Sequence, residues 1–187
     1  MSKLDILDTD GNKTGEVMDF VEAHKMGKWH AHAHVWVFNS KGEVLLQKRA
    51  ANVSCGGKWD ISAAGHLSQG DKPQQAALRE LVEEIGINAK RKELKKIKVL
   101  IQSRDSNDFK NREFNHIYLF RFDGNPNGLK VDEHEVSALK FISLDEFEKE
   151  INDPLLYEKY VPYGDYYKFI IDAIRKELNK LYGDAGI

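Results

Sequence analysis

Three glutamates, Glu80, Glu83 and Glu84, lie close together in one segment of the chain. If this segment is helical, residues three and four positions apart are neighbours, so the three carboxylates gather on one face. Grouped carboxylates repel one another unless cations neutralise them, and oxygen ligands suit hard ions such as Mg²⁺ or Mn²⁺. Because helices are often rich in glutamate, these residues alone favour a solvated acidic face with an Arg79–Glu83 ion pair.

The segment around the glutamates has the start and stop signals of a helix. Asp71 suits the N-cap, Pro73 stands in the first turn where its missing N–H costs nothing, and Gln74 follows Asp71 by three residues. Gly86 is the residue expected just past the helix end. The apolar stripe, on a different face from the glutamates, consists of Ala76, Ala77, Leu81 and Ile85. A helix is therefore predicted between Asp71 and Gly86.

Strands are predicted through the middle of the chain, with helices flanking them. Asp10-Gly11 predicts an N-terminal hairpin of residues 4–7 and 16–18. Residues typical of a half-buried sheet predict strands at 34–38, 43–48, 59–62, 94–102, 114–122 and 139–142, with 102–111 as a variable loop. Ser143 suits the N-cap of a short helix, and residues 163–181 form a long amphipathic one. We expect a mixed α/β protein of the α+β kind, with a mixed sheet sandwiched between helices, in a single domain of residues 1–187.

Composition narrows the class of partner. The formal net charge of -2 lacks the basic footprint of a nucleic-acid or membrane-surface binder, so we expect a small-molecule partner, no nucleic acid and no membrane. The lone Cys55 cannot form an internal disulfide, which fits a reducing compartment. Residues 1–5 do not begin an apolar signal segment, and no apolar run approaches membrane-spanning length. We expect a cytoplasmic protein; nothing in the sequence indicates its oligomeric state.

The stretch from Gly65 to Ile87 resembles the Nudix box, G-x5-E-x7-R-E-U-x-E-E-x-G-U, in which U is a bulky aliphatic residue. The matching residues are Gly65, Arg79, Glu80, Leu81, Glu83, Glu84, Gly86 and Ile87. At average residue usage such a match arises by chance in roughly one chain of this size in a million. Asp71 stands where the pattern has glutamate, which keeps the carboxylate and shortens its reach. We expect Asp71 and Arg79 to support the site rather than to bind substrate.

The resemblance implies the Nudix fold, with the box as a loop-helix-loop at the substrate end of a mixed sheet. It implies that Glu80, Glu83, Glu84 and the Gly65 carbonyl bind Mg²⁺ or Mn²⁺, and that Glu83 and Glu84 are catalytic. Metals bound there would polarise a diphosphate, activate a water and neutralise the leaving phosphate. The implied activity is hydrolysis of a diphosphate linkage in a nucleoside diphosphate derivative or another small organic diphosphate.

Two further groups of residues are candidates for this reaction. A general base is needed, and in the family it is either a box glutamate or one on a later loop. Within residues 132–135 we favour Glu135, with a charged surface turn as the competing interpretation. Lys48 and Arg49 end a predicted strand near the expected box loop, so they are candidates for substrate phosphate binding; a solvated strand end is the alternative.

Outside the box, several short stretches are typical of one branch of the family: residues 22–24 (Glu-Ala-His), 29–30 (Trp-His), 48–50 (Lys-Arg-Ala) and 57–59 (Gly-Lys-Trp), with a strand ending at Asn39. Through them, residues 4–148 resemble the Nudix branch that includes isopentenyl-diphosphate isomerase. That enzyme uses a cysteine just before the Gly-His pair and a glutamate on a later strand. Here the first position is Ala64 and the second falls on Asn115, while Glu113 matches a metal ligand of that branch. Ala64 therefore argues against the isomerase, and Cys55 lies too far upstream to substitute. A non-enzymatic diphosphate-binding module is a third interpretation, against which the intact glutamates argue.

Three histidines, His24, His30 and His66, correspond in that branch to an imidazole metal site. We treat His30 and His66 as a candidate second metal site. The alternative is a partly exposed polar strand face, because His30, His32 and His34 alternate and share one face of an extended strand. We expect His32 and His34 to be structural.

The C-terminal region is rich in tyrosine. We interpret this as packing of the last helix onto the domain, with a base-stacking lid as the alternative. The residues concerned are Tyr157, Tyr160, Tyr163, Tyr166 and Tyr167.

Overall fold

A mixed seven-stranded sheet forms the centre of the computed structural model, which describes residues 3–106 and 109–183. Its strands are β3 (His30–Phe38), β4 (Glu43–Arg49), β5 (Trp59–Asp60), β6 (Ala63–His66), β7 (Lys95–Ser106), β8 (Phe109–Arg121) and β9 (Val136–Ser143). The order is β5-β4-β3-β8-β7, with β6 paired to β3 and β9 to β4. β3 and β8 are parallel, and the other pairs are antiparallel. The sheet is therefore mixed, as predicted.

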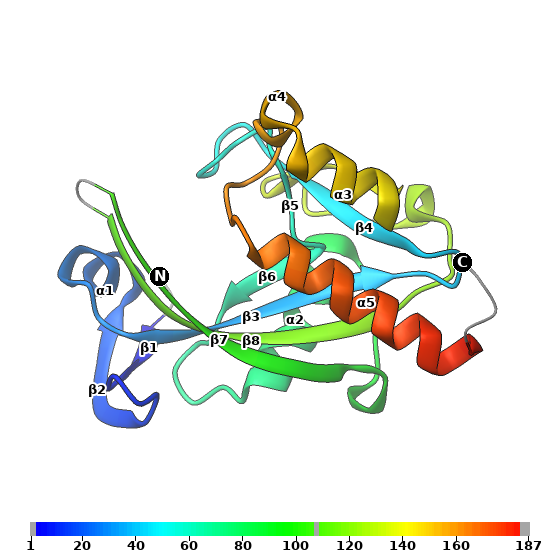
Figure 1. Cartoon of the computed structure of the whole chain (residues 1–187). Coiled ribbons are helices and arrows are strands. Elements are labelled where there is room, and N and C mark those ends of the chain that lie inside the picture. The colour runs from blue at the N-terminus through cyan, green and yellow to red at the C-terminus, as the bar shows by residue number, and fades with distance from the viewer. Residues whose placement is uncertain (1–2, 107–108, 184–187) are drawn as a thin grey trace.

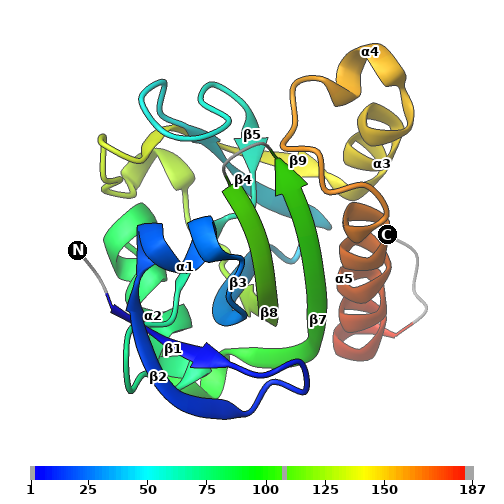
Figure 2. The ribbon, with the colours of Figure 1, turned by 90° about the vertical axis from the view of Figure 1, so that its left-hand side faces the viewer.

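Helices cover both faces of this sheet, as the two views in Figures 1 and 2 show. Helix α2 (Pro73–Ile85) lies on one face, and α3 (Leu144–Asn152) and α5 (Tyr166–Tyr182) lie on the other, with the short α4 (Pro154–Tyr157) beyond them. The predicted α+β class, with a sheet sandwiched between helices, is confirmed. Within the described residues, no helix has the length and apolar character needed to cross a bilayer.

The alternation of side chains along β3 explains why both faces need helices. Trp36 and Phe38 pack against α5, whereas Val35 and Val37 pack against α2, and all four side chains are buried. Successive residues of a strand point to opposite faces, so a central strand that is apolar on both faces must be covered twice.

The N-terminal hairpin is present as a separate two-stranded sheet of β1 (Lys3–Leu7) and β2 (Lys13–Asp19). The sequence did not predict the helix that follows it, α1 (Phe20–Met26), because one or two turns are too short to show a helical period. Its signals are local: the Asp19 side chain accepts the Val21 N–H at 2.9 Å, and Gly27 ends the helix in the left-handed region at φ 64°.

The start of α2 differs by one residue from the prediction. Its N-cap is Lys72, and the Asp71 carboxylate instead accepts the Ser68 N–H at 3.1 Å, which closes the preceding turn. Gln75 rather than Gln74 reaches back to the Lys72 N–H, at 3.3 Å. Gly86 ends the helix at φ 70°, as predicted.

The prediction of a variable loop at residues 102–111 is wrong for the described residues of this stretch. Gln102 pairs with Glu113 and Asp105 with Lys110, so β7 and β8 form one long antiparallel hairpin; residues 107–108 lie outside the described part of the chain. Backbone hydrogen bonds hold such a hairpin whether or not its side chains alternate in polarity. Because the side chains here are polar, nothing in the sequence indicated that the end of β7 and the start of β8 are strands.

Candidate functional site

A cleft of about 730 Å³ lies where β4, β6, α2 and the β7–β8 hairpin meet. It brings together residues that are far apart in the sequence. Its lining includes the predicted site residues Arg49, Gly65, His66, Glu80, Glu83, Glu84 and Glu135, together with Asp60 and Glu113. Acidic, basic and imidazole groups thus share one open space.

Glu80 packs directly against the backbone of Gly65. A Cβ at residue 65 would collide with the Glu80 carboxylate, so only glycine allows this approach. Glu80 is 7% exposed, and burial raises the pKa of its carboxyl to about 7 against the opposing charge of Arg79. Gly65, Glu80, Glu83 and Glu84 are called the acidic cluster below.

Glu84 is 5% exposed, and burial raises the pKa of its carboxyl well above the usual range. Its Oε2 accepts hydrogen bonds from Gln47 Nε2 at 3.0 Å and from the Ala64 N–H at 2.9 Å. Among the described residues, no group hydrogen-bonds to Oε1 of this side chain. One oxygen is therefore fixed by the protein while the other is available to a ligand.

Arg79 connects the exposed side of the acidic cluster to β6. Its Nη1 lies 2.7 Å from Glu80 and 2.9 Å from the exposed Glu83, so the predicted i,i+4 pair is present. Its Nη2 donates to the His66 carbonyl at 3.0 Å and lies 3.5 Å from Asp71. The guanidinium thus joins the helix to the loop before it.

Glu135 lies across the cleft from α2, on an exposed turn. Its backbone is fixed, because its carbonyl accepts the Ala50 N–H at 2.8 Å and its own N–H donates to the Asp132 carbonyl at 3.0 Å. Its charge adds to the rise of the pKa of both Glu80 and Glu84. The turn therefore faces the acidic cluster rather than bulk solvent alone.

The two basic residues at the end of β4 have different surroundings. Arg49 lines the cleft, with Nη1 2.8 Å from Asp60 and Nε donating to the Ser54 carbonyl at 2.5 Å. Lys48 instead lies over the Trp59 ring, with Nζ 5.9 Å from its centroid, and is not among the lining residues of the cleft. Alternation along the strand separates the two side chains.

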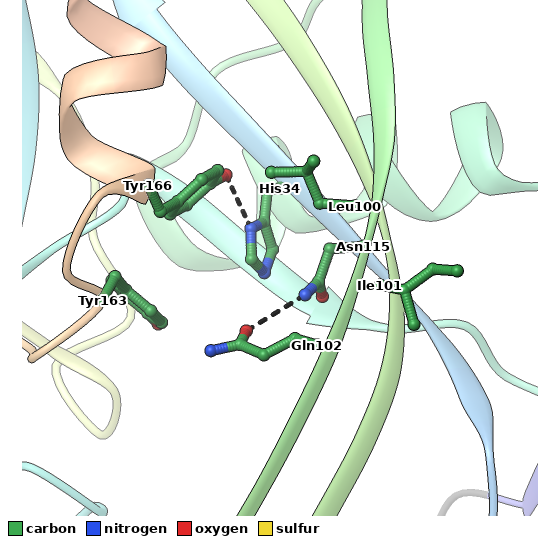
Figure 3. A pocket seen from close by; sticks show the side chains of 7 residues that line it. All are labelled: His34, Leu100, Ile101, Gln102, Asn115, Tyr163 and Tyr166. Carbon is green, nitrogen blue, oxygen red and sulfur yellow. Dashed lines mark hydrogen bonds between the residues drawn. The ribbon is translucent and has the colours of Figure 1, made fainter.

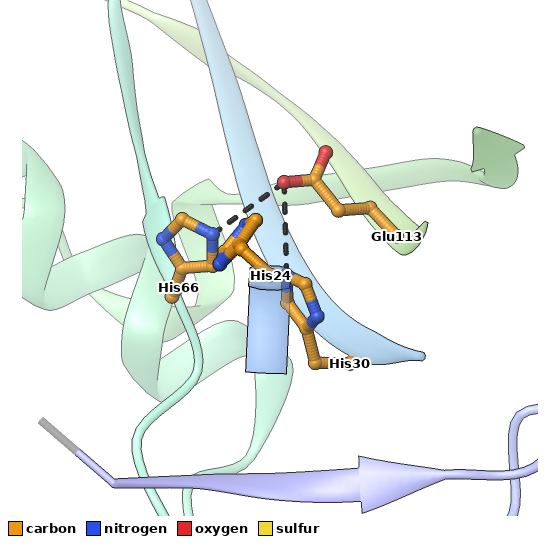
Figure 4. A group of neighbouring side chains, drawn as sticks. All are labelled: His24, His30, His66 and Glu113. Atoms are coloured by element: carbon orange, nitrogen blue, oxygen red, sulfur yellow. Dashed lines mark ion pairs between the residues drawn. The ribbon is translucent and has the colours of Figure 1, made fainter. Parts of the chain in front are cut away.

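The histidines expected from the resemblance meet at a second position, beside the acidic cluster. Figure 4 shows His24, His30 and His66 converging on Glu113. His66 Nε2 lies 3.4 Å and His30 Nε2 lies 3.8 Å from Glu113 Oε1, and one donor atom from each of the four residues lies within 4.8 Å of the others. These four residues are called the imidazole cluster below.

Backbone carbonyls fix the orientation of two rings in the imidazole cluster. His24 Nδ1 lies 2.8 Å from the Phe20 carbonyl and His30 Nδ1 lies 2.9 Å from the Lys28 carbonyl. A nitrogen facing a carbonyl must carry the proton, so Nε2 holds the lone pair. The Nε2 atoms of His24, His30 and His66 are all buried without a hydrogen-bond partner. Burial also lowers the pKa of His24 and His66, which favours the neutral, ligating form.

The alternative of a partly exposed polar strand face is wrong for His30 and His34, which are 0% and 2% exposed. Helix α1 covers the start of β3, and the tyrosines before and within α5 cover His34 (Figure 3). The burial of His30 was not predictable, because helix α1, which covers it, has no periodic signal in the sequence.

The two positions that matter for isomerase chemistry hold no acid or base. Ala64 pairs with His34 across β6 and β3, and Asn115 pairs with His32 across β8 and β3. Asn115 is buried, and its Nδ2 donates to Gln102 Oε1 at 3.2 Å. Cys55 is exposed and lines the same cleft.

Comparisons with known proteins agree with this geometry. A family model described as the NUDIX domain matches residues 28–163. Nudix hydrolase 3 of Arabidopsis thaliana is 38% identical over 184 residues, which cover 92% of this chain but only 23% of that protein. The isopentenyl-diphosphate Delta-isomerase of Serratia proteamaculans (strain 568) is 33% identical over 133 residues, 71% of this chain and 73% of the enzyme.

A similar fold is found in a crystal structure of a Deinococcus radiodurans protein, with a TM-score of 0.67 and 16% identity over 91% of this chain and 98% of that one. The family model covers most of this chain, and both relatives exceed 30% identity over more than two thirds of it. This chain therefore belongs to the Nudix family.

Proposed function

We propose that this protein is a divalent-metal-dependent hydrolase that cleaves the diphosphate linkage of a nucleoside diphosphate derivative or another small organic diphosphate. The observation that carries the proposal is the burial of two carboxylates, Glu80 against the Gly65 backbone and Glu84 beside the Ala64 N–H. Buried carboxylates are unfavourable unless a cation compensates them. Arg79 pairs with Glu80, but no cationic side chain among the described residues contacts Glu84.

The acidic cluster supplies oxygen donors only, a set that suits Mg²⁺ or Mn²⁺. Glu80, Glu83, Glu84 and the Gly65 carbonyl would hold the ion, with Glu84 Oε1 as the available oxygen on the buried side. A bound ion supplies polarisation of the diphosphate and a more acidic water. Nudix proteins generally use divalent metal ions, which agrees with this donor set.

The chain's own groups supply the rest of the proposed reaction. Glu135 faces the acidic cluster across the cleft and would accept the proton of the attacking water. Arg49 would bind a substrate phosphate, because Ser54 and Asp60 hold its Nε and Nη1 and no described residue hydrogen-bonds to Nη2. Lys48 lies over Trp59, so its predicted phosphate contact has less support than that of Arg49.

We further propose that the imidazole cluster holds a second divalent ion. Three buried Nε2 atoms without partners, with Glu113 beside them, form the kind of donor set that imidazole-binding ions such as Zn²⁺ prefer. Because α1 contributes His24 to this set, the N-terminal elements and the central sheet act together, which supports the proposal of one domain over residues 1–187.

Isopentenyl-diphosphate isomerase is the second candidate, favoured by the isomerase relatives and by the imidazole cluster. Ala64 and Asn115 argue against it, because neither can donate or remove a proton at carbon under ordinary conditions.

One experiment tests both candidates on the full chain. Nucleoside and isoprenoid diphosphates are incubated with Mg²⁺ or with EDTA, and the products are followed by phosphorus NMR. We expect Mg²⁺-dependent cleavage of the diphosphate linkage. In parallel, isopentenyl diphosphate in deuterated water is followed by proton NMR; double-bond migration without diphosphate cleavage would replace the hydrolase proposal with the isomerase.

A further inference from the structure

The loop between β6 and α2 reaches the N-terminal sheet, as Figures 1 and 2 show. Two of its backbone N–H groups bond to β1. The Gln69 N–H donates to the Lys3 carbonyl at 2.7 Å, and the Gly70 N–H donates to Asp5 Oδ2 at 2.8 Å. The N-terminal sheet therefore contacts this loop directly, although it lies outside the stretch, residues 28–163, that the family model matches.

Residues 68–71 of this loop form a closed turn, called the 68–71 turn below. The Asp71 N–H donates to the Ser68 carbonyl at 2.9 Å, and the Ser68 N–H donates to Asp71 Oδ2 at 3.1 Å. Gly70 adopts φ 83°, a conformation that side chains rarely allow. The other two N–H groups of the turn, at Gln69 and Gly70, are the ones that donate to β1. The turn thus fixes its own shape, and β1 fixes its position.

The 68–71 turn is connected to the acidic cluster through one guanidinium. Asp71 Oδ2 lies 3.5 Å from Arg79 Nη2, which also donates to the His66 carbonyl at 3.0 Å. Arg79 Nη1 lies 2.7 Å from Glu80 and 2.9 Å from Glu83. A displaced turn would carry the Asp71 carboxylate away from the guanidinium that orients two of the glutamates of the acidic cluster.

Asp5 is itself held in place for the contact with the 68–71 turn. Lys13 Nζ lies 2.5 Å from the same Oδ2 that accepts the Gly70 N–H, and the Asp5 side chain is 20% exposed. Hydrogen bonds to an ionised acceptor are stronger than those to a neutral one. Leu4 and Ile6, on either side of Asp5 in the sequence, are buried in the small core that β1 shares with β2 and α1. The backbone of Asp5 is therefore anchored.

We propose that Asp5 is a positioning residue: it holds the 68–71 turn and, through Asp71 and Arg79, keeps the acidic cluster in the geometry that binds the divalent ion. The inference rests on the proposed hydrolase function for its effect on turnover, and it gives the N-terminal sheet a part in the reaction. A hairpin that only stabilised the fold would change the free energy of unfolding without changing the metal affinity of the folded protein.

The test measures binding of Mn²⁺ to the full chain by electron paramagnetic resonance, which reports the free ion. Binding that is lost in Glu84→Gln is assigned to the acidic cluster. In Asp5→Ala the affinity of this binding should fall about tenfold, the lower end of the effect of losing an outer-shell partner. Asp5→Asn keeps an oxygen that can accept the Gly70 N–H, so its affinity should stay within about threefold of the wild type.

Lys13→Met provides a second, milder variant. It removes the cation that holds Asp5 from an exposed position, so it keeps the test decisive if Asp5→Ala does not fold. The Mn²⁺ affinity of Lys13→Met should fall about threefold.

Asp8→Ala is the matched control. Asp8 belongs to the same hairpin, but its Oδ1 accepts the Asp10 and Asn12 N–H groups, at 2.9 and 2.8 Å, and these bonds stay within the hairpin. The Mn²⁺ affinity of Asp8→Ala should equal that of the wild type, even where thermal unfolding shows a loss of stability as large as in Asp5→Ala. Amide hydrogen exchange of residues 65–72 should be faster in Asp5→Ala and unchanged in Asp8→Ala.

Wild-type Mn²⁺ affinity in folded Asp5→Ala, or in Lys13→Met if Asp5→Ala does not fold, would overturn the inference. An equal loss of affinity in Asp8→Ala, or no binding of Mn²⁺ to the wild type, would overturn it as well. In turnover, Asp5→Ala should need about tenfold more Mg²⁺ for half-maximal cleavage, with little change in the KM for substrate at saturating Mg²⁺. Absence of cleavage of every diphosphate by the wild type would reject the hydrolase function, whereas the Mn²⁺ comparison would still decide whether Asp5 positions the acidic cluster.

Discussion

The acidic cluster and the imidazole cluster adjoin the same cleft but are built in different ways. The acidic cluster takes its side chains from one helix, and its oxygens are oriented by Arg79, Gln47 and the Ala64 N–H. The imidazole cluster takes one residue each from α1, β3, β6 and β8, and backbone carbonyls orient the rings of His24 and His30. The first is therefore determined by local sequence spacing, whereas the second exists only after four elements have packed together.

The two clusters also differ in their donor atoms, so they suit different ions. Oxygen donors with one exposed member favour a hard, partly hydrated ion such as Mg²⁺. Buried neutral imidazoles favour a borderline ion such as Zn²⁺. With one ion at the acidic cluster and another at the imidazole cluster, loss of one ion need not remove the other. Variants of each cluster test whether the two ions bind independently.

Glu84→Gln should have the largest effect. The amide cannot provide the anionic oxygen that Oε1 offers, so Mg²⁺-dependent cleavage should fall by more than the about 10–100-fold typical of losing an outer-shell partner. Steady-state kinetics measure the loss, and Glu22→Gln, an exposed glutamate on α1, serves as the matched control. Full turnover in Glu84→Gln would remove this residue from the proposed site.

His24→Gln should separate the two clusters. Loss of one imidazole is expected to weaken binding of Zn²⁺ or Co²⁺ by at least about 10–100-fold, while Mg²⁺-supported turnover falls much less. Isothermal titration and the visible spectrum of Co²⁺ measure the binding, with the exposed His134→Gln as the control. Unchanged Co²⁺ binding would argue against the imidazole cluster as a metal site.

The pH dependence of stability should reveal the burial of Glu80. Burial raises the pKa of its carboxyl from 4.5 to about 7, so the folded state binds the proton more tightly than the unfolded state. The metal-free protein should therefore lose stability as the pH rises from about 4.5 to about 7, on the order of 3 kcal/mol from this group. Urea unfolding in EDTA measures the slope.

Glu80→Gln should flatten that slope, because the amide does not titrate, and Mg²⁺ should restore stability to the wild type at pH 7.5. The raised pKa of Glu84 also lowers the stability as the pH rises, in the wild type and in the variant alike. The difference between the two proteins is therefore the contribution of Glu80. If the free energy of unfolding depended on pH in the same way in the two proteins, the claim that burial raises the pKa of the Glu80 carboxyl would be wrong.

Asp71→Glu should have the smallest effect. It restores the residue of the family pattern, and the longer side chain can still reach the Ser68 N–H and Arg79. We expect a change in the free energy of unfolding within about 0.5 kcal/mol and little change in turnover. Thermal unfolding and kinetics check it, and a large loss would show that Asp71 does more than support the loop.

Features that depend on residues close together in the sequence were predictable, whereas features that depend on contacts between distant segments were not. The α2 helix and its glutamates were predictable from periodicity and from Gly86, although the turn bond from Asp71 to Ser68 moved the N-cap to Lys72. Helix α1 was too short for a periodic signal, so the burial of His24 and His30, which depends on this helix, was not predictable either. The large cleft could not be predicted as a whole, because its walls come from β4, β6, α2 and the β7–β8 hairpin, which only the fold brings together.

The parallel register of β3 and β8 has a consequence for how this site can change. Glu113 and Asn115 are two residues apart on β8, beside His30 and His32 of β3, so both point to one face about 6–7 Å apart. Glu113 belongs to the imidazole cluster, whereas Asn115 is one of the two positions that separate this chain from the isomerase. Because each side chain occupies its own place along the strand, a substitution at Asn115 need not move the backbone of Glu113, and the two positions can vary independently.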